Sequence, residues 1–116
     1  MDQVLLVIPT PVMRQLYHEL LLDDQYEIVI VDNLTSALGF MVVESFSNIV
    51  VFSRGQTDLD LFLKIRKKKK NWSKTKLILV TDNRSIYQKN LRKNDEVISY
   101  SEDLVQVVKQ IREAIL

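Results

Sequence analysis

The sequence predicts an α/β fold, a three-layer sandwich in which a five-stranded parallel sheet lies between two layers of helices. Two observations predict it. Short, continuous runs of branched apolar residues alternate with longer segments whose apolar residues recur at helical spacing. Proline, glycine and short polar residues separate the two kinds of segment. Strict alternation of strands and helices implies right-handed crossovers and a parallel sheet covered on both faces.

Each expected strand is short and apolar along its whole length, as in a strand buried on both faces. Turn-forming or polar residues follow the first four: Pro9, Asp32, Ser53 and Thr81. Five strand–helix units fit the flavodoxin-like (βα)5 strand order 2-1-3-4-5. The expected strands cover residues 4–8, 28–31, 49–52, 77–80 and 97–98.

The expected helices keep their apolar residues on one face. Pro11 suits a first helical turn, and the fourth helical pattern is the weakest. The helices are expected over residues 11–21, 34–42, 59–65, 86–91 and 104–115. Candidate N-terminal caps are Asn33 or Thr35, Thr57 or Asp58, and Ser101.

Length and composition fit one domain over residues 1–116, because 47% of the residues are hydrophobic and 27% are charged. The chain has no cysteine, which excludes disulfides, thiol catalysis and cysteine metal sites and agrees with a cytoplasmic location. No apolar run approaches the roughly 20 residues of a membrane-spanning helix. The acidic start lacks the basic leader of a signal peptide. A net charge of +1 does not indicate a partner.

Two segments of the sequence have a pattern that is known from one family. They are Val4-Leu5-Leu6-Val7 with Pro11, Met13 and Arg14 for the first strand and helix, and Tyr26-Glu27-Ile28-Val29 with Ala37-Leu38 for the second. In these segments, and in its length and the spacing of its strands and helices, the chain resembles the CheY-like receiver domains of response regulators, which serve bacterial two-component signalling. These are resemblances of fold, and they support the fold more than an activity.

The resemblance implies a site at the carboxyl ends of the strands. Receivers hold Mg²⁺ with two acidic residues after the first strand and an aspartate at the end of the third. That aspartate accepts the phosphoryl group. A Thr or Ser ends the fourth strand, and a Lys that pairs with the phosphate ends the fifth.

This sequence departs from that pattern at nearly every position. The acidic pair falls on Ile8 and Pro9, with Thr10 beside them. The phosphoacceptor falls on Ser53, or on Phe52 if the preceding loop has no insertion. The lysine falls on Tyr100 and the aromatic switch residue on Val97, and only Thr81 is retained, followed by Asp82.

The departures predict an atypical receiver, or pseudo-receiver, without aspartyl phosphorylation, catalytic residues, metal or cofactor. No Asp lies between Glu44 and Asp58, and hydroxyls are poor ligands for Mg²⁺ without carboxylates. Ser53 is a weak nucleophile with no evident general base. Asp58 and Asp60 are alternative acids, but negative charge also suits the start of the third helix.

The first functional hypothesis is a non-enzymatic protein-interaction module. It uses the face of the fourth helix, fifth strand and fifth helix, where Val97, Tyr100 and Val105 fall. An exposed aromatic there anchors a partner protein or a second copy of the chain. Alternatively, the ring of Tyr100 plugs the degenerate phosphorylation site. A receiver switched by unusual chemistry at Ser53, Thr81 or Asp58 is a third hypothesis.

The second hypothesis concerns residues 64–76, which hold eight of the sixteen basic residues and no acid. Lys67, Lys68, Lys69 and Lys70 with Trp72 form a candidate anion patch, for nucleic acid through phosphate contacts and stacking, for an acidic protein or for an anionic membrane surface. A solvated helix end explains the same run, because cations favour a helix C-terminus and lysine stems cover apolar surface.

Overall fold

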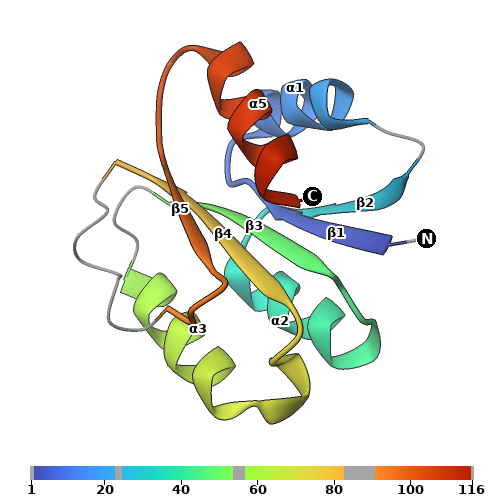
Figure 1. Cartoon of the computed structure of the whole chain (residues 1–116), viewed down its shortest axis with the longest axis vertical. Coiled ribbons are helices and arrows are strands. Elements are labelled where there is room, and N and C mark those ends of the chain that lie inside the picture. The colour runs from blue at the N-terminus through green and yellow to red at the C-terminus, as the bar shows by residue number, and fades with distance from the viewer. Residues whose placement is uncertain (1, 23–24, 54–56, 83–90, 116) are drawn as a thin grey trace.

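The computed structural model describes residues 2–22, 25–53, 57–82 and 91–115. Five strands form one parallel sheet in the order β2-β1-β3-β4-β5 (Figure 1). The predicted fold class and strand order are therefore confirmed. The strands are β1 (Asp2–Val7), β2 (Tyr26–Val31), β3 (Asn48–Ser53), β4 (Lys76–Thr81) and β5 (Glu96–Ser99).

Helices cover both faces of the sheet. Figure 1 shows α1 and α5 on one side and α2 and α3 on the other. The helix expected over residues 86–91 falls outside the described residues except for Leu91, which is not helical. The helical elements are α1 (Pro11–Leu21), α2 (Leu34–Val43), α3 (Thr57–Lys68), the short 3-10 helix η1 (Lys70–Trp72) and α5 (Leu104–Ile115).

The core consists of two apolar clusters, one on each face of the sheet, because successive side chains of a strand point to opposite faces. In β3, Ile49 and Val51 join the cluster under α2 and α3, whereas Val50 and Phe52 join the cluster under α1 and α5. All six residues of β3 are buried. The continuous apolar runs of the sequence thus reflect burial on both faces.

The helix starts test the predicted caps. Asn33 caps α2, since its side-chain oxygen accepts a hydrogen bond from the Ser36 N–H at 2.7 Å. The prediction of Ser101 for the last helix is wrong: Asp103 caps α5 through the Gln106 N–H at 3.3 Å. Ser101 precedes this cap in the sequence, and its hydroxyl oxygen accepts a hydrogen bond from the Asp103 N–H at 3.1 Å. The side chains of the candidates for α3, Thr57 and Asp58, lie outside the described part.

Among the helices that the structure describes, none combines the length and apolar character needed to cross a bilayer.

Candidate functional site

A cavity of about 270 Å³ opens at the carboxyl ends of the strands, and we call it the rim cavity. It brings together five of the six residues predicted for the degenerate phosphorylation site, because parallel strands end at the same edge of the sheet. The sixth, Thr81, adjoins it through its register pairing with Ser53. The lining residues are Ile8, Pro9, Thr10, Met13, Phe52, Ser53 and Tyr100.

The β1 side of the rim cavity is apolar and is braced by a cation. Ile8 is buried, and its backbone N–H extends the sheet by donating to the Val31 carbonyl at 3.0 Å. Arg14, in the first turn of α1, donates from Nη1 to the carbonyl oxygens of Ile8 and Pro9 at 2.9 and 3.0 Å. A guanidinium therefore lies directly behind the two positions that are acidic in receivers, and its charge repels a second cation.

The β3 side of the rim cavity carries a buried hydroxyl. Ser53 is 1% exposed, and its Oγ has no hydrogen-bond partner among the residues that the structure describes. A buried polar group without a partner loses its bonds to water without replacement. No base within the described residues takes up the Ser53 proton by a hydrogen bond, so none of them activates the hydroxyl as a nucleophile.

Tyr17 supplies a second buried hydroxyl behind this wall. Its ring packs against Phe52 with the ring centroids 4.6 Å apart. Its hydroxyl also has no hydrogen-bond partner within the described ranges. Burial, and secondly the neighbouring Tyr100, raise the pKa of Tyr17 to about 12, since the ionised form has little compensation there.

Tyr100 forms the β5 side of the rim cavity. Its backbone N–H donates to the Thr81 carbonyl at 2.9 Å, which continues the β4–β5 pairing. The side chain is partly buried against the α1–α5 cluster and lines the rim cavity. Its ring lines the rim cavity, which stays open beside it, and keeps an exposed portion.

Across the described residues, no three His, Asp or Glu side chains come together as a metal site. The chain contains no cysteine that could add to such a set. The donors present at the rim cavity are hydroxyls and backbone groups, a set that holds Mg²⁺ poorly.

No family profile matches this sequence, and no curated protein matches it. Among solved structures, the response regulator TrrA from Thermotoga maritima, in complex with Mg²⁺–BeF, is 25% identical with a TM-score of 0.71; the match covers 98% of this chain and 99% of that one. CheY4 of Vibrio cholerae is 18% identical (TM-score 0.76, 100% and 99% covered). The phosphorylated cyanobacterial regulator RcpA is 17% identical (TM-score 0.78, 97% and 91% covered). This chain has the CheY-like receiver fold.

Within the receiver fold, the predicted interaction face is divided between the two sides of the sheet. Val97 is partly buried and packs on the α2–α3 cluster. Tyr100 packs on the opposite cluster. Val105, in the first turn of α5, is 75% exposed. Of the three residues predicted for this face, the exposed apolar surface therefore comes from Val105 and part of Tyr100.

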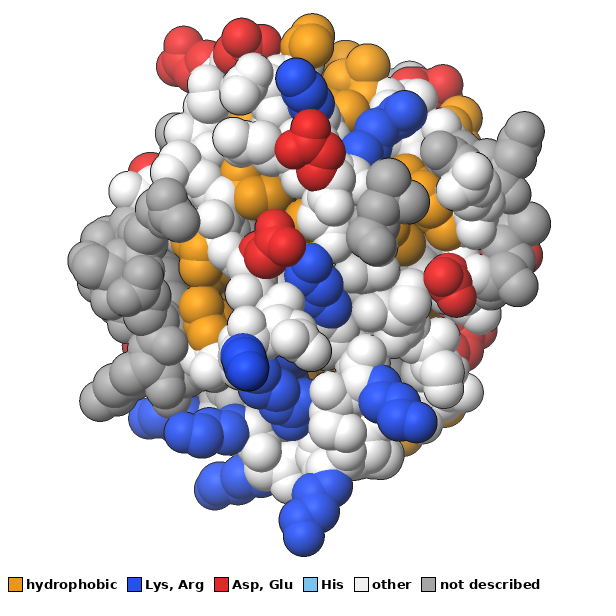
Figure 2. Space-filling view, in the orientation of Figure 1, with side chains coloured by type: hydrophobic (Ala, Val, Ile, Leu, Met, Phe, Trp, Pro, Cys, Tyr) orange, Lys and Arg blue, Asp and Glu red, His pale blue; other side chains and the backbone are white. Residues whose placement is uncertain are grey.

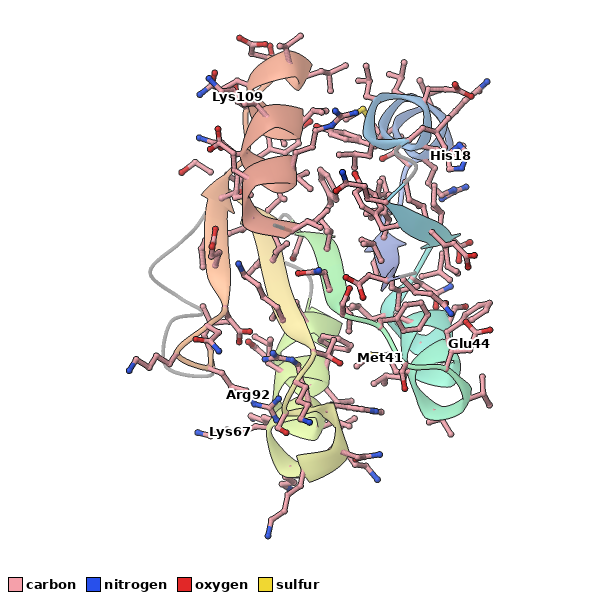
Figure 3. The ribbon with its side chains drawn as sticks, turned by 45° about the vertical axis from the view of Figure 1, so that its right-hand side comes forward. His18, Met41, Glu44, Lys67, Arg92 and Lys109 are labelled. Carbon is pink, nitrogen blue, oxygen red and sulfur yellow. The ribbon has the colours of Figure 1, made fainter. Side chains whose placement is uncertain are left out.

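The lysine cluster, Lys67 to Lys70, lies at the end of α3 and the start of η1, away from the rim cavity. All four side chains are exposed. Figure 2 shows Lys and Arg side chains gathered at this end of the molecule, and Figure 3 shows Lys67 pointing away from α3.

Trp72 does not belong to the lysine cluster, so its prediction as a stacking residue is wrong. The side chain is 7% exposed, and its indole Nε1 donates to the Met41 carbonyl at 3.2 Å. A large indole with an internal acceptor gains more from burial under α2 than from solvent. It cannot stack on a nucleic-acid base from this position.

Proposed function

We propose that this chain is a receiver-type signalling domain that works by protein contact and without aspartyl phosphorylation. The observation that carries the proposal is the β1 side of the rim cavity. Ile8 and Pro9 occupy the acidic positions, and Arg14 binds their carbonyl oxygens. A site that must attract Mg²⁺ is thus apolar and carries a positive charge behind its wall.

The chemistry of the β3 end supports the same proposal. A receiver forms an acyl phosphate on a carboxylate that Mg²⁺ helps to neutralise. Here the strand ends in Ser53, which lines the rim cavity together with the apolar Phe52 and Ile8 and has a buried hydroxyl. The described residues offer neither the carboxylates that would hold Mg²⁺ nor a base bonded to Ser53, so they provide no source for attack on phosphorus or for stabilisation of the product.

If the chain is not phosphorylated, it can still signal through contact with another protein. TrrA, which shares the fold, has been crystallised in complex with the histidine kinase ThkA. The matched chain of that complex is 24% identical to this one. In this chain, the exposed Val105 and the partly exposed ring of Tyr100 flank the β5–α5 connection. Aromatic and apolar side chains at the centre of a contact supply most of its binding energy. We propose a protein partner for this face.

The phosphorylation part is tested by adding Mg²⁺ and beryllofluoride while amide chemical shifts are recorded. We expect no saturable change at Ser53 and Thr81. A matched variant with Pro9→Asp and Ser53→Asp restores two carboxylates at the rim, and we expect it to bind Mg²⁺ with shifts at the same amides. Saturable shifts in the unmodified protein would refute the proposal and favour a switch through Ser53 or Thr81.

The contact part is tested by sedimentation velocity over a range of concentrations, first for a second copy as the partner. Val105→Glu places a charge on the proposed face, and Gln106→Glu places the same charge on the neighbouring exposed residue. Self-association through this face is lost in Val105→Glu and kept in Gln106→Glu. Self-association that both variants keep belongs to another surface and contradicts the assignment.

A second candidate function is anion or nucleic-acid binding, and the exposure of all four residues of the lysine cluster favours it. Their charges would act on phosphates without base contacts. The test is binding to duplex DNA at two salt concentrations, with Lys67 to Lys70 changed to Gln in the comparison protein. Affinity that falls with salt and with the four substitutions supports this function, and affinity indifferent to them removes it.

A further inference from the structure

The rim cavity combines apolar walls with hydroxyl groups and carries no charge on its described lining. Ile8, Pro9, Met13 and Phe52 supply the apolar surface, and Thr10, Ser53 and Tyr100 supply the hydroxyls. Ligand sites in proteins have this composition: mostly apolar walls and a few placed polar groups. A charged ligand would lose its hydration there without gaining a direct ion pair, because Arg14 lies behind the wall and outside the lining.

The Ser53 hydroxyl indicates which chemical group a ligand of the rim cavity must carry. Its hydroxyl can donate one hydrogen bond and accept others. It makes none with the described residues, and Ser53 is only 1% exposed, so water has little access to it. Polar groups buried to this degree are nearly always paired. The Oγ atom itself is buried in the structure, so a ligand with a donor or acceptor at this point completes the pairing once the Ser53 side chain turns to another χ1 rotamer, toward the cavity.

The size of the rim cavity limits the ligand. A volume of about 270 Å³ lies just below the roughly 300–1,000 Å³ of most ligand pockets. It is several times the roughly 30 Å³ that one water molecule occupies in the liquid. The space suits a single ring or a short branched chain.

We propose that the rim cavity binds a small, neutral molecule that joins an apolar ring or branched chain to one hydrogen-bonding group, which pairs with Ser53. The inference goes beyond the proposed function, because protein contact operates with or without such a ligand. The side chain of Tyr100 forms a wall of the cavity, so the Tyr100 amide reports on binding.

The test uses three probes of nearly equal shape: benzamide, which is neutral, benzoate, which is anionic, and benzamidine, which is cationic. Each is titrated into the whole protein while amide chemical shifts are recorded. We expect benzamide to shift the amides of Thr10, Ser53 and Tyr100 saturably, with a Kd of roughly 1–10 mM for a fragment of about nine non-hydrogen atoms. Benzoate and benzamidine should bind at least about tenfold more weakly, because the lining offers neither probe a direct ion pair; Arg14 lies behind the wall, with its guanidinium bound to the carbonyl oxygens of Ile8 and Pro9.

Two variants separate the Ser53 hydroxyl from the cavity space. Ser53→Ala removes the hydrogen bond and keeps the space, so benzamide affinity should fall roughly three- to tenfold. Ser53→Val also fills the space, and the expected loss is larger. Ser73→Ala, an exposed serine in the turn after η1, is the matched control and should leave the affinity unchanged.

Saturable shifts confined to the rim cavity, selective for benzamide and weakened in Ser53→Ala, support the inference. No saturable shift with benzamide, equal binding of all three probes, or an affinity indifferent to Ser53→Ala overturns it. Ser53→Ala decides the matter alone if Ser53→Val does not fold. The beryllofluoride titration is independent, so failure of either proposal is recognised separately.

Discussion

The guanidinium of Arg66 and the carboxylate of Asp95 form a two-pronged ion pair, with both N···O distances at 2.7 Å and both side chains 1% exposed. Asp95 also accepts from the backbone N–H groups of Leu77 at 2.9 Å and Arg92 at 2.7 Å. Arg66 donates further to the Thr75 carbonyl at 3.0 Å. The pair therefore joins α3 to the starts of β4 and β5, at the end of the sheet remote from the rim cavity.

Arg92 completes this junction from the segment before β5. Its guanidinium donates to the Arg66 carbonyl oxygen at 2.9 Å, in the last turn of α3, and to the Trp72 carbonyl oxygen at 2.7 Å, beyond that helix. Figure 3 shows it beside that helix end. Cations are favoured at the carbonyl end of a helix. Partial burial and the nearby charge of Arg66 lower its pKa, and Asp95 partly offsets both.

The first prediction concerns Asp95→Ala. Removing the carboxylate leaves the Arg66 guanidinium buried without a counter-charge and two backbone N–H groups without an acceptor. The free energy of unfolding should fall by about 3–5 kcal/mol. Urea unfolding measures the change.

The exposed pair of Lys76 and Glu96 is the matched control for this prediction. The two groups lie 2.8 Å apart with side chains 24% and 49% exposed. Solvent screens such a pair, so Glu96→Ala should cost no more than about 1 kcal/mol. Arg66→Met combined with Asp95→Ala should cost less than Asp95→Ala alone, because no charge stays buried. Similar losses in all three variants would contradict the role of burial.

The fold was predictable because its signal is local. Each strand buried on both faces leaves an unbroken apolar run, such as residues 49–52. The rim cavity was largely predictable for a related reason: strand ends converge in a parallel sheet, so Ile8, Ser53 and Tyr100 had to meet. The contribution of Arg14 was not predicted, since it depends on how the first turn of α1 folds back over Pro9.

The basic run between residues 64 and 76 was the least predictable part of the chain. Its composition indicates exposed surface, yet Arg66 and Trp72 are buried. A signal was present for Arg66, which follows Leu59 by seven residues and Phe62 by four and so lies on the buried stripe of α3. Its partner was beyond sequence reasoning, because Asp95 is 29 residues away and nothing local relates the two.

The second prediction concerns the pH dependence of stability. The pKa of Tyr17 is raised to about 12 from an ordinary value of 10.0. Between these values the unfolded chain releases the proton and the folded chain keeps it, so the stabilisation present below pH 10 is lost as the pH rises. At about pH 11 the loss from this group is about 1.4 kcal/mol. Unfolding in urea at about pH 8 and pH 11 measures it.

Tyr17→Phe isolates this effect from other groups that titrate at high pH. The variant keeps the ring contact with Phe52 and lacks the titrating hydroxyl, so its decline in unfolding free energy should be smaller than that of the unmodified protein. Equal declines would mean that the Tyr17 hydroxyl ionises in the folded state with its ordinary pKa.

The third prediction compares two hydroxyls that differ in their partners. The Oγ of Ser53 has none among the described residues, whereas Oγ1 of Thr75 donates to the Phe46 carbonyl at 2.8 Å. Ser53→Ala removes a group whose desolvation is uncompensated, so the free energy of unfolding should stay unchanged or rise by up to about 1 kcal/mol. Thr75→Val keeps the branched shape but removes a hydrogen bond, and should lower it by about 1 kcal/mol.

Both variants are compared in urea under the same conditions, so the difference between them is the quantity of interest. The Phe46 carbonyl loses its hydrogen-bond donor when Thr75 is changed, whereas no described acceptor receives a hydrogen bond from the Ser53 hydroxyl. The two changes should therefore differ in sign or by at least about 1 kcal/mol. A loss in Ser53→Ala as large as that in Thr75→Val would mean that the Ser53 hydroxyl is paired in solution, and the case for a ligand at that point would then lack its main support.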